Sequence, residues 1–298
     1  MQPGRSRDIL PGIITRPAQI HQADLVREAT SWDVLMINQI KSTLDQVKQN
    51  KPLVLCLTNY VTMDLMANGL LALGAVPLMS ESREELEELI TISQAVYINI
   101  GTLSHAFMER AFISAKIANI LNKPVILDPV GAGASKLRTS AAMELLPLAD
   151  LIRGNASEII ALNGAASATK GVESTDPVQK AIKSAQSLAQ EHNKIIVISG
   201  PEDFVTDGKQ EQILTFGSHL MPLITGMGCT MTAVLSAFMA CNPDHFQAAL
   251  HATAYFGLCG QLTHQHAKAP ASFRHAFIDN LFNPDWDFFT HATKAVDN

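Results

Sequence analysis

Apolar runs alternate with amphipathic segments along most of the chain. Short, nearly continuous apolar stretches at 53–57, 95–100, 124–128, 149–153 and 194–200 have the length and composition of strands buried on both faces of a sheet. Segments with apolar residues at helical spacing separate them, the first over 32–50, where Asn50-Lys51-Pro52 ends the pattern. The alternation is typical of βαβ units and predicts an α/β fold with a mostly parallel sheet.

The remaining elements follow from turn residues and periodicity. Helices are predicted over 63–73, 83–92, 104–121, 177–191 and 244–264, and a short strand over 76–80. Asp207-Gly208 between the runs 204–206 and 212–216 predicts an antiparallel hairpin at the sheet edge. The segment 162–175 is rich in Gly, Ala, Ser and Thr and is predicted to be a surface loop.

Polar residues and glycine follow the predicted strands where each strand ends. Asn59, Met79, Gly101 and Asp128 stand at four such carboxyl ends. Ligands of parallel α/β sheets bind at that edge. We therefore expect a binding site there.

The stretch 221–235 predicts a loop, a tight turn and a buried helix, because Thr225-Gly226-Met227-Gly228-Cys229 precedes a long apolar run. Two glycines separated by one residue allow a sharp turn, and the helix dipole adds partial positive charge, so the backbone from Gly226 to Cys229 is predicted to bind an anion. A thiol at a helix N-terminus is also expected to have a lowered pKa, which makes Cys229 a candidate base or nucleophile. The alternative is a glycine turn with only a structural role. No Lys-Ser/Thr pair follows the glycines, so this is not a Walker A loop.

A second helix start has two interpretations. Asn155 and Glu158 stand three residues apart after the predicted strand 149–153. They form a candidate capping box, which would be purely structural. Glu158 has a functional role only if it also faces the crevice at the sheet edge.

Composition excludes several classes of protein. The 298 residues are 47% hydrophobic and 17% charged, enough for one sizeable domain, and the net charge of −6 with few aromatic residues argues against a nucleic-acid partner. No apolar run is long enough to span a bilayer, so no membrane partner is expected. The four cysteines are widely spaced, which favours neither a zinc site nor a disulfide framework and fits a cytoplasmic protein. The late histidines lack the spacing of a zinc-binding helix.

Several ordered motifs resemble those of the hydroxyethylthiazole kinase family, which belongs to the ribokinase-like superfamily. The resemblance covers about 37–282 and rests on Thr58-Asn59-x-Val61, Ala67-Asn68-Gly69-Leu70-Leu71-Ala72-Leu73-Gly74-Ala75, Asn99-Ile100-Gly101-Thr102-Leu103, Leu127-Asp128-Pro129-Val130-Gly131-Ala132-Gly133, Ile152-Arg153-Gly154-Asn155-Ala156-Ser157-Glu158 and Gly226-x-Gly228-Cys229. It implies a three-layer α/β/α sandwich, which we expect in a single domain over 32–298. Residues 1–31 are mixed in charge and contain Pro3, Pro11 and Pro17, so they are predicted to form an irregular extension. The resemblance also implies a homotrimer with active sites between subunits.

The resemblance further implies ATP-dependent phosphorylation of 4-methyl-5-(2-hydroxyethyl)thiazole in thiamine salvage, with Mg²⁺ as cofactor. The implied thiazole site is lined by Asn59, Val61, Met79 and Gly226. The positions implied to contact ATP are Arg153 and Ser199, and the acidic pair implied near Mg²⁺ is Asp128 and Glu158. Cys229 is implied to lie beside the reacting hydroxyl, as proton acceptor or orienting group.

A few departures from the family pattern leave fine specificity open. Met227 stands where a smaller residue is usual between the glycines, Ser199 replaces Thr, and the run 269–273 lacks two glycines. Three alternatives to a thiazole kinase are a kinase for another heterocyclic alcohol such as a pyrimidine, a non-catalytic metabolite-binding relative, and a cysteine hydrolase. A hydrolase would need a histidine beside Cys229, and the sequence places none there.

Overall fold

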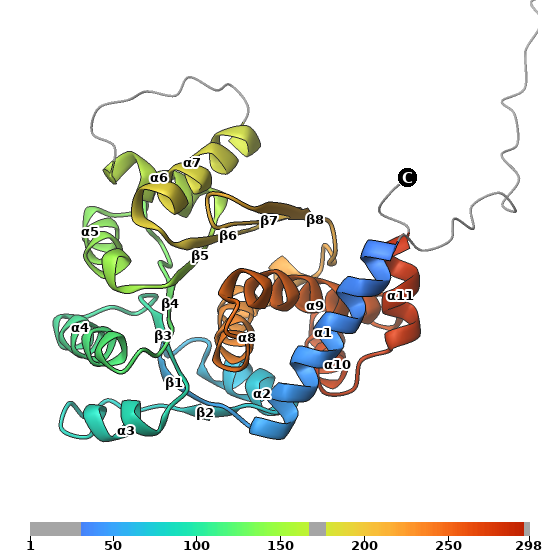
Figure 1. Cartoon of the computed structure of the whole chain (residues 1–298), viewed down its shortest axis with the longest axis horizontal. Coiled ribbons are helices and arrows are strands. Elements are labelled where there is room, and N and C mark those ends of the chain that lie inside the picture. Colours follow the sequence, from blue (N-terminus) through green and yellow to red (C-terminus); the bar gives the residue numbers. More distant parts are fainter. Residues whose placement is uncertain (1–30, 167–176, 295–298) are drawn as a thin grey trace, which may run out of the picture.

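Eight strands form one sheet in the computed structural model, which describes residues 31–166 and 177–294 (Figure 1). The order along the sheet is β2-β1-β3-β4-β5-β6-β7-β8. The strands from β2 to β6 in this order pair in parallel, whereas the β6–β7 and β7–β8 pairs are antiparallel. The strands are β1 (Leu53–Leu57), β2 (Val76–Leu78), β3 (Ala95–Asn99), β4 (Val125–Asp128), β5 (Leu151–Asn155), β6 (Ile195–Ser199), β7 (Asp203–Thr206) and β8 (Glu211–Leu214). The predicted mostly parallel sheet and its antiparallel edge are confirmed.

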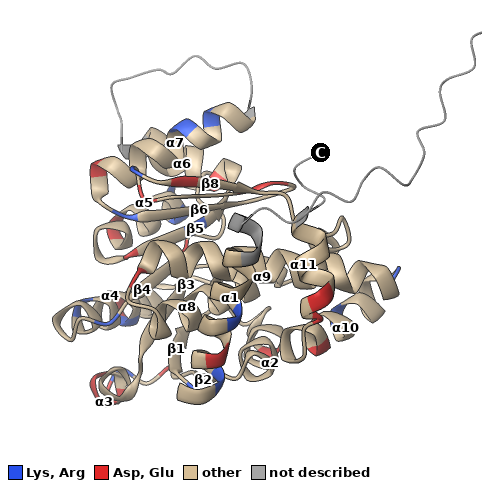
Figure 2. Ribbon diagram, turned by 45° about the vertical axis from the view of Figure 1, so that its right-hand side comes forward, with Lys and Arg blue, Asp and Glu red and all other residues tan. Residues whose placement is uncertain are grey.

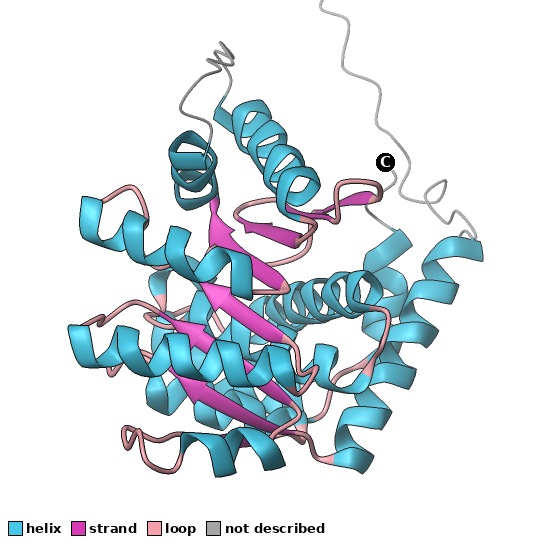
Figure 3. Cartoon of the chain, turned by 60° about the vertical axis from the view of Figure 1, so that its left-hand side comes forward, coloured by secondary structure: helices cyan, strands magenta, loops and turns pink. Residues whose placement is uncertain are grey.

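Helices cover both faces of the sheet, so the predicted three-layer sandwich is also confirmed (Figure 3). One face is covered by α1 (Ser31–Asn50), α2 (Met63–Leu73), α8 (Met227–Cys241), α9 (His245–His266), α10 (Pro270–Phe282) and α11 (Trp286–Lys294). The other is covered by α3 (Leu86–Ile92), α4 (His105–Ile120), α5 (Lys136–Leu145), α6 (Ala156–Ala166) and α7 (Pro177–His192).

Strands β1 and β3 to β7 each contribute to two separate hydrophobic cores, because successive side chains point to opposite faces. In β3, Tyr97 packs on the α8 side, whereas Val96 and Ile98 pack on the α4 side. The helices on the α8 side include two, α8 and α9, that contain no Lys, Arg, Asp or Glu (Figure 2). A helix without charged residues is suited to burial, and α8 lies across β1, β3 and β4 at the centre of the sheet.

One prediction about local structure is wrong. Residues 162–166 continue helix α6 instead of starting a loop, because the small residues there are compatible with a helix; 167–175 lie outside the described residues. Helices α5, α10 and α11 were not predicted. The run 269–273, which has lost its glycines, begins α10 with Pro270 in its first turn, a position where proline's missing N–H costs no hydrogen bond.

The predicted extension 1–31 lies outside the described residues except for Ser31, where α1 begins. Within 31–166 and 177–294, none of the helices combines the length and apolarity needed to cross a bilayer. In the same ranges no three His, Cys, Asp or Glu side chains gather as a metal cluster.

Candidate active site

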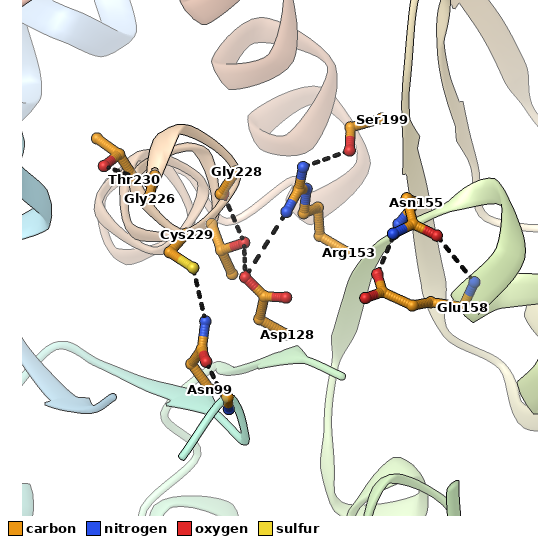
Figure 4. A network of polar contacts seen from close by, with 12 residues as sticks. Asn99, Asp128, Arg153, Asn155, Glu158, Ser199, Gly226, Gly228, Cys229 and Thr230 are labelled. Carbon is orange, nitrogen blue, oxygen red and sulfur yellow. Dashed lines mark hydrogen bonds and ion pairs between the residues drawn. The ribbon is translucent and has the colours of Figure 1, made fainter. Parts of the chain in front are cut away.

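The site lies on the α8 face of the sheet, at the carboxyl ends of its central strands. Residues two apart in a strand share a face. Tyr97 and Asn99 therefore share the α8 side of β3, and Arg153 shares the α8 side of β5 with Leu151. Asp128 ends β4 on the same side, two residues after Ile126. The strand alternation thus brings an acid, a cation and an amide to one edge (Figure 4).

The two glycines before α8 have different roles. Gly226 is the N-cap and has a φ of 91°, a left-handed conformation that disfavours any side chain. Gly228 lies inside the helix, and a Cβ there would be 2.6 Å from Nη1 of Arg153. Gly226 therefore makes the turn, whereas Gly228 allows the guanidinium to approach the helix. The prediction that both glycines form the turn is corrected in this respect.

The start of α8 presents backbone donors to the site. Gly226 offers no capping side chain, and helix geometry leaves the N–H groups of Gly228 and Cys229 without acceptors inside the helix. The predicted anion-binding backbone is thus present in form, from Gly226 through Met227 and Gly228 to Cys229. Met227 is buried and belongs to the core on the α8 side.

Asp128 is the central carboxylate and is only 1% exposed. Its Oδ2 accepts a hydrogen bond from Thr232 Oγ1 at 2.8 Å and lies 3.7 Å from Nη1 of Arg153, whereas its Oδ1 is buried with no partner among the described residues. Burial raises the pKa of Asp128 to about 6, opposed by the charge of Arg153 and assisted by that of Glu158. An unpartnered carboxylate oxygen in a buried site is suited to a cation.

Arg153 lies between the end of β6 and the start of α8. Its Nη2 donates a hydrogen bond to Ser199 Oγ, and its Nε is buried without a partner (Figure 4). The predicted ATP contacts Arg153 and Ser199 therefore touch each other. The guanidinium faces the N-terminus of α8, so it adds a full positive charge to the partial charge of the helix dipole.

Cys229 is surrounded by amides rather than by a base. Its Sγ lies 3.2 Å from Asn99 Nδ2 and 3.5 Å from Asn59 Nδ2, and Asn59 also donates to Asn99 Oδ1 at 2.9 Å. Burial is the largest effect on the pKa of Cys229 and raises it, with the charge of Asp128 acting in the same direction. The prediction of a lowered pKa is wrong, because burial and a nearby carboxylate outweigh the helix dipole and the amide donors.

Glu158 meets the structural conditions for both of its proposed roles. Its Oε2 accepts the Asn155 N–H at 2.8 Å and Asn155 Oδ1 accepts the Glu158 N–H at 3.0 Å, so the capping box is confirmed. Its Oε1 accepts the Gly131 N–H at 2.9 Å. The side chain also lines the cavity of about 850 Å³ that contains Asp128 and Arg153. The carboxylate is thus fixed by backbone while it faces the site.

A cavity of about 850 Å³ contains most of the predicted residues. Among those lining it are Asp128, Arg153, Glu158, Ser199, Gly226 and Cys229. Its size suits a nucleotide.

Three predicted thiazole residues do not line that cavity. Asn59 is buried behind Cys229, and Val61 is 69% exposed on the surface. Met79 lines a separate cavity of about 130 Å³ between the ends of β1 and β2 and helix α4, together with Tyr60, Glu81 and Arg110. The structure therefore groups the residues predicted for ATP more closely than those predicted for thiazole.

Sequence reasoning missed Tyr97, Asn99 and Thr232 as site residues. The Tyr97 hydroxyl accepts from Asn99 Nδ2 at 2.9 Å and lies 3.1 Å from the Cys229 carbonyl oxygen. Strand parity was the available signal, because Tyr97 and Asn99 are the polar positions of an otherwise apolar strand, and Asn99 lies level with Asp128 in the register. Thr232 lies in a helix of buried residues and gave no comparable signal.

The chain is similar in sequence to a known protein family over most of its length. Residues 44–285 match the family described as the hydroxyethylthiazole kinase family. Hydroxyethylthiazole kinase of Chlamydia felis is 44% identical over 254 residues, 85% of this chain and 97% of that protein. Hydroxyethylthiazole kinase of Nitratidesulfovibrio vulgaris is 44% identical over 241 residues, 80% of this chain and 90% of that protein.

Solved structures agree with the fold. The hydroxyethylthiazole kinase structure from Pyrococcus horikoshii has a TM-score of 0.78 and 36% identity, covering 84% of this chain and 95% of that one. A ribokinase-like superfamily protein from Enterococcus faecalis, at 13% identity and a TM-score of 0.58, covers 78% of this chain and 88% of that one and shows the fold alone. The ribokinase-like fold expected from the motifs is confirmed.

Proposed function

This chain belongs to the hydroxyethylthiazole kinase family, and on that premise we propose that it transfers the γ-phosphoryl group of ATP to the hydroxyl of 4-methyl-5-(2-hydroxyethyl)thiazole. Such a reaction serves thiamine salvage. The observation that carries the proposal is one cavity in which Asp128, Arg153 and the first N–H groups of α8 meet. Phosphoryl transfer depends chiefly on positioning and on neutralising charge, and these groups are suited to both.

The proposed division of labour follows from the contacts. Arg153 and the N–H groups of Gly228 and Cys229 bind the phosphates of ATP, because they present positive charge and donors to one space. Ser199 fixes the guanidinium through its hydroxyl. In this arrangement the transferred group lies between α8 and Asp128, on the cavity side of Arg153.

We propose that Asp128 and Glu158 hold Mg²⁺. The unpartnered Oδ1 of Asp128 fits a hard cation, and a buried carboxylate of raised pKa gains from one. Mg²⁺ usually binds through one or two carboxylates together with substrate phosphates and water, so a larger acidic cluster is not required. Held by Asp128 and Glu158, the ion would supply positive charge to neutralise the charge that develops on the transferred phosphoryl group.

Cys229 acts as an orienting group in this proposal. Its raised pKa keeps the thiol protonated near neutral pH, and its amide neighbours Asn59 and Asn99 fix its position. A proton acceptor would need the opposite shift. The same argument disfavours a cysteine hydrolase, since such an enzyme depends on a thiolate.

We propose that Asn59, Val61, Met79 and Gly226 bind the thiazole in a homotrimer whose active sites lie between subunits. The exposure of Val61 and of its neighbour Tyr60 supports this, because apolar residues beside a site gain from being covered by a partner. Light scattering that gives the mass of a monomer would contradict the trimer. We also propose a single kinase domain over 32–298 with an extension over 1–31, acting in the cytoplasm, where its four unpaired cysteines suit reducing conditions.

The test is phosphate transfer from ATP to a panel of alcohols, with and without Mg²⁺. The proposal expects a phosphorylated thiazole and ADP in equal amounts, only when Mg²⁺ is present. Transfer to a pyrimidine alcohol instead would support the alternative kinase. Binding of ATP and thiazole without transfer would support a non-catalytic relative.

A further inference from the structure

Asp203 has a buried carboxylate beside the candidate site, and the proposed function gives it no role. It is the first residue of β7, only 8% exposed, and it lines the same cavity as Arg153 and Ser199. None of the motifs that indicated the family contains it. A charged residue is rarely buried without a specific partner, so its surroundings call for an explanation.

Strand register places Asp203 next to Ser199 and on the side of Arg153. β6 and β7 are antiparallel with Ile198 opposite Phe204, so Ser199 and Asp203 are the next pair across. Residues opposite each other in an antiparallel pair point to the same face, with neighbouring Cβ atoms. The register also places Val197 beside Arg153, and Val197 lies two residues from Ser199 on the α8 face. Arg153, Ser199 and Asp203 therefore share one face.

The carboxylate of Asp203 has a hydrogen bond and a favourable charge interaction. Oδ1 accepts the Gly200 N–H at 3.0 Å, which closes the turn between β6 and β7. Burial raises the pKa of Asp203 to about 7, opposed first by the hydrogen bond from the Gly200 N–H and then by the charge of Arg153, which favours the ionised carboxylate. The carboxylate thus combines a structural bond with an electrostatic one.

Arg153 needs negative charge on more than one side. Its guanidinium lies against Gly228, where the partial positive charge of the α8 N-terminus repels it. Asp128 attracts it from 3.7 Å, but a close pair with Asp128 would occupy the carboxylate that the proposed reaction needs. A second carboxylate on the opposite side would keep the cation between the two.

We propose that Asp203 is a positioning residue that holds the Arg153 guanidinium at the N-terminus of α8, where it can bind the phosphates of a nucleoside triphosphate. This inference deepens the proposed function and rests on it. Asp203 itself does not touch the nucleotide. Its effect is electrostatic and passes through Arg153.

The experiment compares ATP affinity of the full chain and its variants by titration calorimetry. Asp203→Asn removes the charge but keeps an oxygen that can accept the Gly200 N–H. We expect the dissociation constant for ATP to rise about tenfold, since one favourable charge interaction is weakened. The matched control is Glu202→Gln, which removes the exposed neighbouring charge and should leave the affinity unchanged.

A double-mutant cycle tests whether the effect of Asp203 on ATP affinity passes through Arg153. In an Arg153→Met background, Asp203→Asn should no longer change the affinity, because the partner is gone. In steady-state kinetics Asp203→Asn should raise KM for ATP and leave KM for the alcohol unchanged. If the Asn variant does not fold, Asp203→Ser, whose hydroxyl can also accept the Gly200 N–H, replaces it.

An unchanged or tighter affinity for ATP in Asp203→Asn would overturn the inference, because removing a carboxylate that merely repels phosphate would tighten binding. An equal effect in the Arg153→Met background would overturn it as well. Failure of the proposed function is distinguishable, since the wild-type chain would then bind ATP without transferring phosphate to thiazole, or bind none.

Discussion

The two faces of the central sheet end differently at its carboxyl edge. On the α8 face the strands end in polar residues, among them Asn99, Asp128, Arg153 and Ser199. On the face covered by α3 to α7 the preceding residues, including Ile98, Leu127 and Ile152, are apolar and buried. The same strands therefore serve stability on one side and chemistry on the other.

The difference has a physical reason. Buried polar groups need partners, and α8 supplies them: Thr232 donates to Asp128, and Cys229 contacts Tyr97 through its carbonyl oxygen and Asn99 through its thiol. The other face has helices that pack on apolar residues over their whole contact. Substitutions in adjacent positions of one strand should therefore have opposite consequences for activity and stability.

The largest effect is expected from Asp128→Asn. This change keeps the shape and the Thr232 contact but removes the charge that faces the transferred group. We expect kcat to fall about 100- to 1,000-fold, as for other charge-stabilising groups in active sites. Steady-state phosphate transfer measures it; a kcat within a few-fold of wild type, in folded protein, would contradict the role.

A polar residue on the α8 side but outside the site should affect stability alone. His251 in α9 is buried with neither ring nitrogen bonded, and burial lowers its pKa to about 4 from 6.5. Between these two pKa values the unfolded chain binds a proton at His251 that the folded chain does not. The stability associated with the neutral imidazole is therefore fully present above pH 6.5 and is lost as the pH falls towards 4. Between pH 8 and pH 5, the free energy of unfolding of the wild type should fall by about 2 kcal/mol more than that of His251→Leu.

Urea unfolding of both proteins at the two pH values measures that difference. Parallel loss in wild type and His251→Leu would show that other groups cause it. Phosphate transfer by the variant at pH 8 should match wild type, since His251 lies outside the cavity lining.

A smaller effect is expected from Gly228→Ala. Its Cβ would come within 2.6 Å of Arg153 Nη1 and must displace the guanidinium. We expect KM for ATP to rise about tenfold with little change in stability, because the backbone conformation suits alanine. The matched control is Gly164→Ala in α6, where a Cβ meets nothing within 4 Å and should leave KM unchanged.

The smallest effect on catalysis is expected from Cys229→Ser. A hydroxyl keeps the hydrogen bonds with Asn59 and Asn99 and does not need to ionise, so single-turnover transfer should slow by less than about tenfold. A loss of about 1,000-fold would instead assign proton abstraction to the thiol.

Much of the fold could be predicted from the sequence. The apolar runs and the Asp207-Gly208 turn predicted where the strands lie along the chain and which of them pair in parallel or antiparallel. Buried parallel strands and tight hairpins have strong local signals. Helices α10 and α11 were missed, and their burial depends on partners distant in the sequence: both pack on α9, and α11 also packs on α1.

The candidate site was predictable only in part. Glycines and strand-end residues indicated Gly226 and Asp128, and the resemblance to the kinase family indicated Arg153. The pKa of Cys229 could not be predicted, since it depends on burial and on the Asp128 charge, which come together only in the folded chain. Asp203 gave no local signal either, because its proximity to Arg153 arises from two strand pairings.

The most direct test compares neighbours in β5 that lie on opposite faces. Single-turnover transfer of phosphate from ATP to thiazole would be measured for Arg153→Met and Ile152→Ala at equal concentrations of folded protein. The account predicts that Arg153→Met slows transfer at least about 100-fold, whereas Ile152→Ala transfers at the wild-type rate and loses about 2–5 kcal/mol of stability. Wild-type transfer by Arg153→Met, or an equally slow Ile152→Ala, would contradict the assignment of catalysis to the α8 face.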